Sequence, residues 1–292
     1  MSITVRQFSA QVKDPATGNM IPAGLLSSDS LTAINTAKNE AVSLVTEVGV
    51  NVSEAIQKSY RGKNLGTSIT SAQLTAISSG TFDNLYIGDY WIINGTRYDI
   101  ADMDYWYNCG DTAFTKHHLV MIPHYILYSA KMNSTNTTVG AYVGSAMYTG
   151  TYDSESDEKG LTRARTKIAT DFGANLLTHR ILLNNAVTNG YASGYLWIDS
   201  TVDLMSEKMV YGTQIYSAMP NGSTILTQYT VDKTQLAIFR IMPTAINTRQ
   251  SYWLRDVVSG TAFACVSYFG SAYGYAASGS LGVRPAFAVG VA

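Results

Sequence analysis

The sequence predicts an α+β protein with an N-terminal extended arm, a long helix and a large strand-rich domain. Three observations support this. Short apolar runs alternate with turn residues over the C-terminal three quarters of the chain, one heptad pattern of apolar residues precedes them, and only 14% of the 292 residues are charged. The predicted domains are an attachment arm at 1–27, a coiled-coil helix at 28–62 and a head at 63–292.

The composition limits the classes of partner. The formal net charge is −1, which gives no general electrostatic attraction to nucleic acid or to an anionic membrane. No apolar run reaches the ~18 residues that a membrane span needs, and the first residues lack the pattern of a signal peptide. We therefore expect neither nucleic-acid binding nor membrane insertion. The 20 tyrosines and 24 glycines favour a loop-rich protein with a polar, uncharged surface.

The first segment has the features of a small arm or hairpin. In SITVRQFSAQV the apolar residues Ile3, Val5, Phe8 and Val12 alternate well enough for a strand. DPATGN follows, where proline presets the backbone and glycine permits a positive φ angle, as a turn requires. The segment has too little apolar material for a core of its own.

The second segment predicts an amphipathic helix that begins after the capping residues Ser28, Asp29 and Ser30. Apolar residues recur at alternating steps of three and four, interrupted by Lys38, and we call this row the seam. A single helix cannot bury such a stripe, and β-branched residues in it favour a homotrimer. Packing of the helix on its own downstream domain is the alternative. The predicted oligomerisation residues are Leu31, Ile34, Ala41, Val45, Val48 and Val52.

The remaining chain predicts many short strands and two helices. Asn94-Gly95 between WII and TRYDI is a strong signal for a β-hairpin turn. One helix is expected at about 157–172, which is rich in lysine, arginine and alanine. The other is expected at about 202–211, in the run VDLMSEKMVY.

Residues that commonly bind metals or catalyse reactions have mainly structural interpretations here. His117 and His118 are adjacent, so in a strand they point to opposite faces and do not share an ion. The carboxylates of YDIADMDYWY are expected to be hydrogen-bonded structural groups, with calcium binding or acid–base work as the alternative. We predict no metal, no cofactor and no catalytic residues. Cys109 and Cys265 are expected to be free and buried, with a disulfide as the alternative.

The last forty residues combine a definite frame with a variable interior. Trp253 and Arg255 open this segment, and Gly282, Arg284 and Pro285 close it. A buried arginine can bridge several carbonyl oxygens through its planar guanidinium, and proline fits a strand edge or a strand start. Between these frame residues lie serine, glycine, alanine, tyrosine and phenylalanine with hardly a charge.

An ordered set of motifs carries a family resemblance. GDYWIING, HHLVMIP, LTHRILL, YWLR and the terminal GVRPAF are similar to C-type-lectin-like domains of phage fibre and tail proteins. The resemblance implies a lectin-like head on a coiled-coil stem, and QVKDPATGNMIP resembles the attachment strands of baseplate and fibre proteins. Some such heads are diversified by retroelements through NNY codons, which never encode Lys, Glu, Gln, Met or Trp. Residues 254–292 contain none of these five.

The segment between the frame residues is the predicted ligand-binding region. Tyrosine gives wide amphipathic contact at low entropic cost, and serine and glycine give adaptable hydrogen bonding. Alternation in TAFACVSYF predicts that Ala262, Ala264 and Val266 point inward. The alternate residues Thr261, Phe263, Cys265 and Ser267 would then point outward or toward a neighbour. The predicted ligand contacts are Ser267, Tyr268, Phe269, Ser271, Tyr273, Tyr275 and Ser278.

The expected function is that of a bacteriophage virion fibre or receptor-binding protein. Residues 1–27 would attach it to a tail, baseplate or capsid protein, and the head would bind a glycan or protein on the host cell surface. A capsid or baseplate decoration without a specific ligand is the alternative. An enzyme is not expected, because the related formylglycine-generating oxidases need a reactive cysteine pair and no activating pattern flanks either cysteine here.

Overall fold

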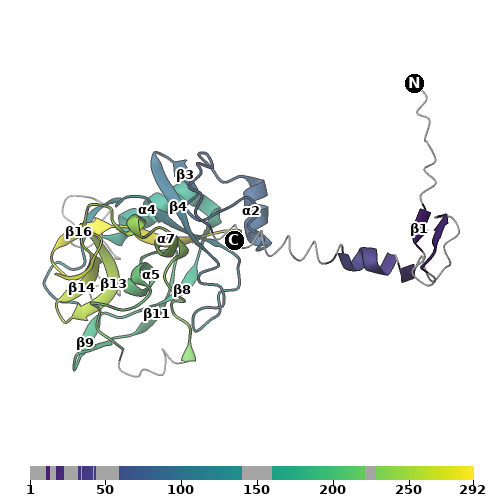
Figure 1. Cartoon of the computed structure of the whole chain (residues 1–292). Coiled ribbons are helices and arrows are strands. Elements are labelled where there is room, and N and C mark those ends of the chain that lie inside the picture. The colour runs from purple at the N-terminus through teal and green to yellow at the C-terminus, as the bar shows by residue number, and fades with distance from the viewer. Residues whose placement is uncertain are drawn as a thin grey trace. The chain divides into compact units, whose positions relative to one another are not determined.

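The computed structural model describes residues 11–13, 18–22, 32–33, 35–41, 43, 59–139, 160–220 and 228–292. The chain divides into two units, Met1–Ile56 and Gln57–Ala292, which are described separately (Figure 1). The described part is mixed α+β with mostly sheet, as the sequence predicts. None of its helices is both long enough and apolar enough to span a membrane.

The first unit contains a short hairpin and a helical stretch. Strands β1 (Gln11–Lys13) and β2 (Met20–Pro22) pair antiparallel, with Val12 opposite Ile21, which confirms the hairpin predicted around DPATGN. Residues 32–33, 35–41 and 43 are helical, and Ala41 of the seam lies in this helix. The strand positions Ile3, Val5 and Phe8 and the seam residues Leu31, Ile34, Val45, Val48 and Val52 lie outside the described residues.

The first large sheet of the second unit has the strand order β12-β17-β5-β4-β3, and β7 (Leu176–Leu177) also pairs with β17. The hairpin between β3 (Tyr90–Ile93) and β4 (Thr96–Met103) turns at Asn94-Gly95, where both φ angles are positive, as predicted. The remaining strands are β5 (Leu119–Pro123), β12 (Val202–Leu204) and β17 (Pro285–Val289).

The second large sheet has the order β15-β14-β13-β16-β6 and draws four strands from the end of the chain. These strands are β13 (Tyr252–Ser259), β14 (Ala262–Val266), β15 (Ala272–Ala276) and β16 (Ser280–Val283), which pairs with β6 (Tyr128–Lys131). Only Arg284 separates β16 of this sheet from β17 of the first. The framed segment therefore connects the two sheets.

Helix α4 (Leu161–Phe172) covers the first sheet. Its buried residues Leu161, Ala164, Ile168 and Phe172 follow the helical period, and the Phe172 ring lies 4.9 Å from that of Phe287 on β17. The helix predicted at about 157–172 is therefore confirmed over 161–172, and residues 157–159 lie outside the described ones. The other helix prediction, 202–211, is half wrong: Val202–Leu204 pairs with β17 as a strand, and helix α5 (Glu207–Tyr211) begins only after its capping residue Ser206.

Short elements complete the second unit. Helix α2 (Ser71–Ser78) begins with a capping box between Thr70 and Gln73. Two further antiparallel pairs are present, of which β9 and β10 contact β13 of the second sheet. The pairs and the remaining helical turns are β8 (His179–Leu183) with β11 (Leu196–Ser200), β9 (Ala186–Thr188) with β10 (Tyr191–Ser193), η2 (Gly173–Asn175), α7 (Ala237–Ile241) and η3 (Pro243–Ile246).

Candidate ligand-binding surface

The predicted ligand contacts lie on β15 and on the turns before and after it. The four large side chains are exposed: Tyr268 by 55%, Phe269 by 72%, Tyr273 by 49% and Tyr275 by 43%. The rings of Tyr268 and Phe269 lie 3.9 Å apart, and alternate positions on β15 place Tyr273 and Tyr275 on one face. We call these four residues the aromatic surface.

The predicted serines mainly shape the turn. The hydroxyls of Ser267 and Ser271 are 2.7 Å apart, and the backbone N–H of Phe269 donates to the Ser267 hydroxyl at 3.3 Å. The Tyr211 hydroxyl donates to the carbonyl of Gly270 at 3.0 Å, which ties the turn to helix α5. Ser267 and Ser271 therefore hold the turn that carries Tyr268 and Phe269. Ser278, in the turn after β15, is half-buried.

All five frame residues are buried, as predicted for a scaffold. The Trp253 indole N–H donates to the carbonyl of Ala130 at 2.8 Å, and its ring centre is 6.1 Å from that of Tyr275. Gly282 leaves no room for a side chain, because a Cβ there would lie 2.5 Å from Ile126 Cγ2. Pro285 is the first residue of β17, the strand start that its missing N–H allows.

Arg284 bridges carbonyl oxygens, as predicted for a buried arginine in the frame. Its Nε donates to Pro123 and its Nη1 to Ala245, each at 2.9 Å. The guanidinium also lies over the ring of Tyr252, 5.3 Å from its centre. This side chain fixes the junction between the two sheets.

For Phe263 and Cys265 the outward option is wrong, and Ala262, predicted to point inward, is only half-buried. Phe263 and Cys265 are fully buried rather than exposed, although Ala264 and Val266 point inward as expected. Consecutive residues of β14 are buried, so both faces of this strand are covered by other parts of the chain. Burial raises the pKa of Cys265 to about 12 and also raises that of Cys109, and both thiols are free, as predicted.

Sequence reasoning missed the loop beside the aromatic surface. Ile215 and Tyr216 are exposed, and the Tyr216 ring centre lies 5.6 Å from that of Tyr273. The buried carboxylate of Glu207 accepts the backbone N–H groups of Ile215, Tyr216 and Ser217 at 2.8–2.9 Å. The Ser206 capping signal locates the start of this helix, but nothing in the spacing shows that Glu207 holds a loop eight to ten residues later.

The histidines and carboxylates form structural pairs. His117 Nδ1 lies 2.6 Å from Asp104, and His124 Nδ1 lies 2.6 Å from Asp99. Asp102 accepts the backbone N–H of Ala237 at 2.8 Å, so it bonds α7 and does not share a ligand site with Asp104. Within the described ranges, no three histidine, cysteine or carboxylate side chains are grouped as metal ligands.

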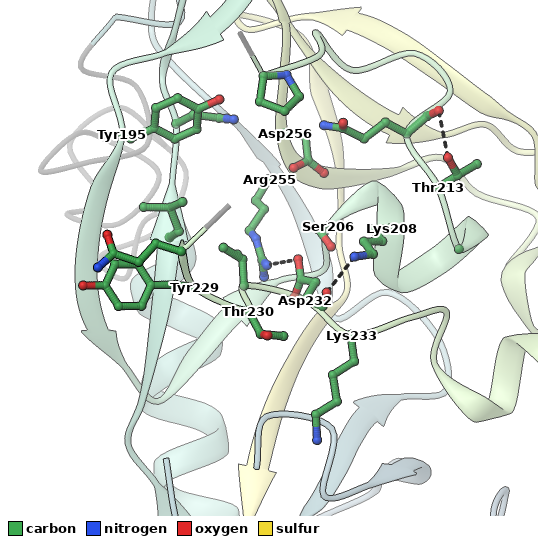
Figure 2. Close-up of a pocket in the computed structure, with 17 residues that line it drawn as sticks. Tyr195, Ser206, Lys208, Thr213, Tyr229, Thr230, Asp232, Lys233, Arg255 and Asp256 are labelled. Atoms are coloured by element: carbon green, nitrogen blue, oxygen red, sulfur yellow. Dashed lines mark hydrogen bonds and ion pairs between the residues drawn. The ribbon is translucent and has the colours of Figure 1, made fainter. Parts of the chain in front are cut away.

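A polar pocket of about 590 Å³ is lined in part by residues 212–214, which directly precede the exposed Ile215 and Tyr216. Arg255 of the frame lines it and forms an ion pair with Asp232 at 2.5 Å (Figure 2). Asp256, the next residue on β13, also lines the pocket and accepts the backbone N–H of Glu207 at 2.5 Å. Desolvation raises the pKa of Asp256 to about 6.

Comparison with known proteins gives no assignment: a scan against protein-family models and searches of curated proteins and of solved structures each returned no match.

Proposed function

We propose that this chain is a bacteriophage virion fibre protein whose lectin-like head binds a host surface ligand through the aromatic surface. The observation that carries the proposal is the exposure of Tyr268, Phe269, Tyr273 and Tyr275, on β15 and the turn before it, in a segment whose frame residues are buried and hydrogen-bonded. Exposed large apolar side chains gathered on one surface mark interaction sites, and tyrosine is favoured in paratopes. The motif resemblance supplies the phage context.

The other parts of the proposal concern assembly. The seam of residues 28–62 holds three copies together, and residues 1–27 attach the trimer to the virion. Three heads on one stem raise the effective concentration of each weak site, so the trimer binds a repeated surface more tightly than one head does. Catalysis through the cysteines is disfavoured, because burial raises the pKa of both thiols and a reactive cysteine needs a lowered one.

The test is adsorption of the purified full chain to a panel of Gram-positive and Gram-negative bacteria, with its mass measured in solution. We expect a trimer that coats at least one strain. The double variant Tyr273→Ala and Tyr275→Ala should lose coating at least tenfold, whereas the control Tyr191→Ala, an exposed tyrosine on β10, should keep it.

Three results would contradict the proposal. A trimer that coats no strain would favour a capsid or baseplate decoration, and coating that survives the double variant would place the contact elsewhere. A monomer would indicate that the helix packs on its own head and that the seam is not an oligomerisation surface.

A further inference from the structure

A second cavity, of about 560 Å³, lies between the β3–β4 hairpin turn, the segment that follows β5 and helix α4. The side-chain amide of Asn94 in the turn donates to Asp171 of α4 at 2.8 Å, so the turn and the helix lie side by side (Figure 1). The volume falls in the range of small-molecule sites. We call this cavity the basic cleft, and its lining comes from residues 94–97, from residues 124–128 and from α4 between Arg163 and Asp171.

Positive charge exceeds negative charge around the basic cleft. The cationic side chains that line it are Arg97, Arg163 and Lys167, and among the described residues the lining carboxylate is Asp171. A second carboxylate, the buried Asp99, accepts from Arg97 Nε at 2.7 Å. Three cations against these two carboxylates leave an excess of one positive charge, so the cleft attracts an anion.

Arg163 is the cation without a carboxylate partner in the described part of the chain. Its side chain is exposed, and its guanidinium lies over the Tyr128 ring, 4.7 Å from the ring centre. The Tyr128 hydroxyl donates to the carbonyl of Gly160 and accepts the backbone N–H of Ala164 at 3.1 Å, which fixes the ring against the first turn of α4. The N–H donors of Arg163 have no described acceptor and are therefore available to a ligand.

The position of Arg163 is unfavourable for α4 itself. The residue lies in the first turn, which contains no acidic residue and where the helix dipole disfavours a cation. Asp171, near the other end, also opposes the dipole, but bonds from Tyr98, Asn94 and Lys167 stabilise it. Arg163 has no such bonds within the described ranges. A cation that opposes the dipole without a bonded partner is explained by a ligand that binds it.

The available groups in the basic cleft are donors rather than acceptors. Arg97 binds Asp99 through Nε, and its two terminal nitrogens have no partner among the described residues. The ammonium of Lys167 donates to Asp171 at 2.9 Å and keeps further N–H groups. A phosphate group, with several acceptor oxygens and more than one negative charge, matches such a surplus of cationic donors better than a carboxylate does.

An exposed aromatic ring completes the lining of the basic cleft. Tyr125 is 65% exposed, and its ring lies edge-on to that of His124, with 4.6 Å between the ring centres. A large exposed ring beside a small-molecule cavity offers contact area to an apolar group. The lining therefore favours a ligand that has an apolar part as well as an anionic one.

We propose that the basic cleft binds a phosphate ester, a small molecule in which a phosphate group adjoins an apolar or aromatic group. The phosphate accepts hydrogen bonds from Arg163, Arg97 and Lys167, and the apolar group lies against Tyr125. The cleft shares no residue with the aromatic surface and does not depend on the proposed virion role.

The test is calorimetric titration of the purified full chain, in phosphate-free buffer, with phenyl phosphate, inorganic phosphate and benzoate. We expect saturable binding of phenyl phosphate and about tenfold weaker binding of benzoate, which has fewer acceptor oxygens and less charge. Tyr125→Ala should weaken the binding of phenyl phosphate and leave that of inorganic phosphate unchanged.

Two variants of Arg163 test its role. Arg163→Gln should weaken the binding of phenyl phosphate about tenfold, because charged hydrogen bonds are lost. Arg163→Lys keeps the charge but loses the planar fork, so it should bind more weakly than the wild type and more tightly than Arg163→Gln. The matched control Arg249→Gln also removes an exposed arginine and should bind normally. The double variant Tyr273→Ala and Tyr275→Ala should also bind normally, which separates the cleft from the aromatic surface.

Three results would overturn the proposal. One is the absence of saturable binding by phenyl phosphate and by inorganic phosphate. Another is binding of benzoate as tight as that of phenyl phosphate, which would make the ligand a carboxylate. A third is wild-type affinity for phenyl phosphate in both Arg163→Gln and Arg163→Lys, once circular dichroism shows that the two variants are folded.

Discussion

The carboxylate of Glu207 accepts the backbone N–H of Tyr216 at 2.8 Å, and so a buried acid holds an exposed aromatic residue in place. Ile215 and Ser217 donate to the same carboxylate. Charge-assisted bonds of this kind are stronger than neutral ones. The orientation of Tyr216 beside Tyr273 therefore depends on a residue that cannot touch a ligand at the surface.

Replacement of this acid should loosen the loop and lower stability. Glu207→Ala leaves three backbone N–H groups without their acceptor, so we expect a loss of about 2–4 kcal/mol in the free energy of unfolding. Urea denaturation measures the loss, and hydrogen exchange should rise at residues 215–217. The exposed Asp83→Asn serves as control, and equal stability of Glu207→Ala and wild type would contradict the assignment.

The junction between the sheets should require arginine specifically. Arg284→Lys keeps the charge but loses the planar fork that reaches both Pro123 and Ala245, so we expect a loss of about 2–4 kcal/mol. Guanidinium denaturation measures this. The matched control Arg249→Lys, at an exposed position, should change stability by less than about 0.5 kcal/mol.

Acid should destabilise the second unit through two buried histidines. Burial lowers the pKa of His118 to about 4 and that of His179 to about 3, from 6.5 in the unfolded chain. Below pH 6.5 the unfolded chain binds more protons than the folded one, so this stability is complete above about pH 7 and is lost as the pH falls toward 4. We expect a loss of about 2 kcal/mol per histidine at pH 5.

Thermal unfolding between pH 7.5 and pH 4.5 tests this effect. His179→Phe keeps a ring stacked on Trp106, whose centre is 4.0 Å from that of His179, and removes one titrating group. Its melting temperature should fall less with pH than that of the wild type. Identical pH profiles for the two proteins would exclude His179 as a cause.

The two thiols should react only after unfolding. Cys109 and Cys265 are buried and free, and desolvation raises the pKa of each, so little thiolate exists in the folded protein at pH 8. Ellman's reagent should label both thiols in denaturant and neither in buffer over an hour. Labelling of neither in denaturant would reveal a disulfide, and rapid labelling in buffer would show that the thiols are accessible.

Local signals in the sequence predict the fold class and several details correctly. Asn94-Gly95 specifies its hairpin because both residues tolerate positive φ angles, and the bridging role of Arg284 follows from its chemistry in an apolar segment. The helix predicted at 202–211 is half wrong because Val202–Leu204 pairs with β17, a strand more than 80 residues later. Such long-range pairing overrides local propensity and leaves no local trace.

The site is only partly visible in the sequence for the same reason. The exposed rings of Tyr268, Phe269, Tyr273 and Tyr275 are found from composition, but the burial of Phe263 and Cys265 depends on what packs on the faces of β14. The pocket is assembled from six segments, so no motif marks it. Its residues become neighbours only when β8, the segment around α5, residues 228–233 and β13 fold together.

Strand β15 ends its sheet, and among the described strands it pairs only with β14. Its sequence, AYGYA, carries neither the charge nor the proline with which natural edge strands discourage pairing between molecules. Tyrosine on such an edge favours strand addition by another copy of the protein. Concentrated preparations should therefore associate edge to edge, and a lysine at Ala272 or Ala276 would be the first change to make for crystallisation or storage.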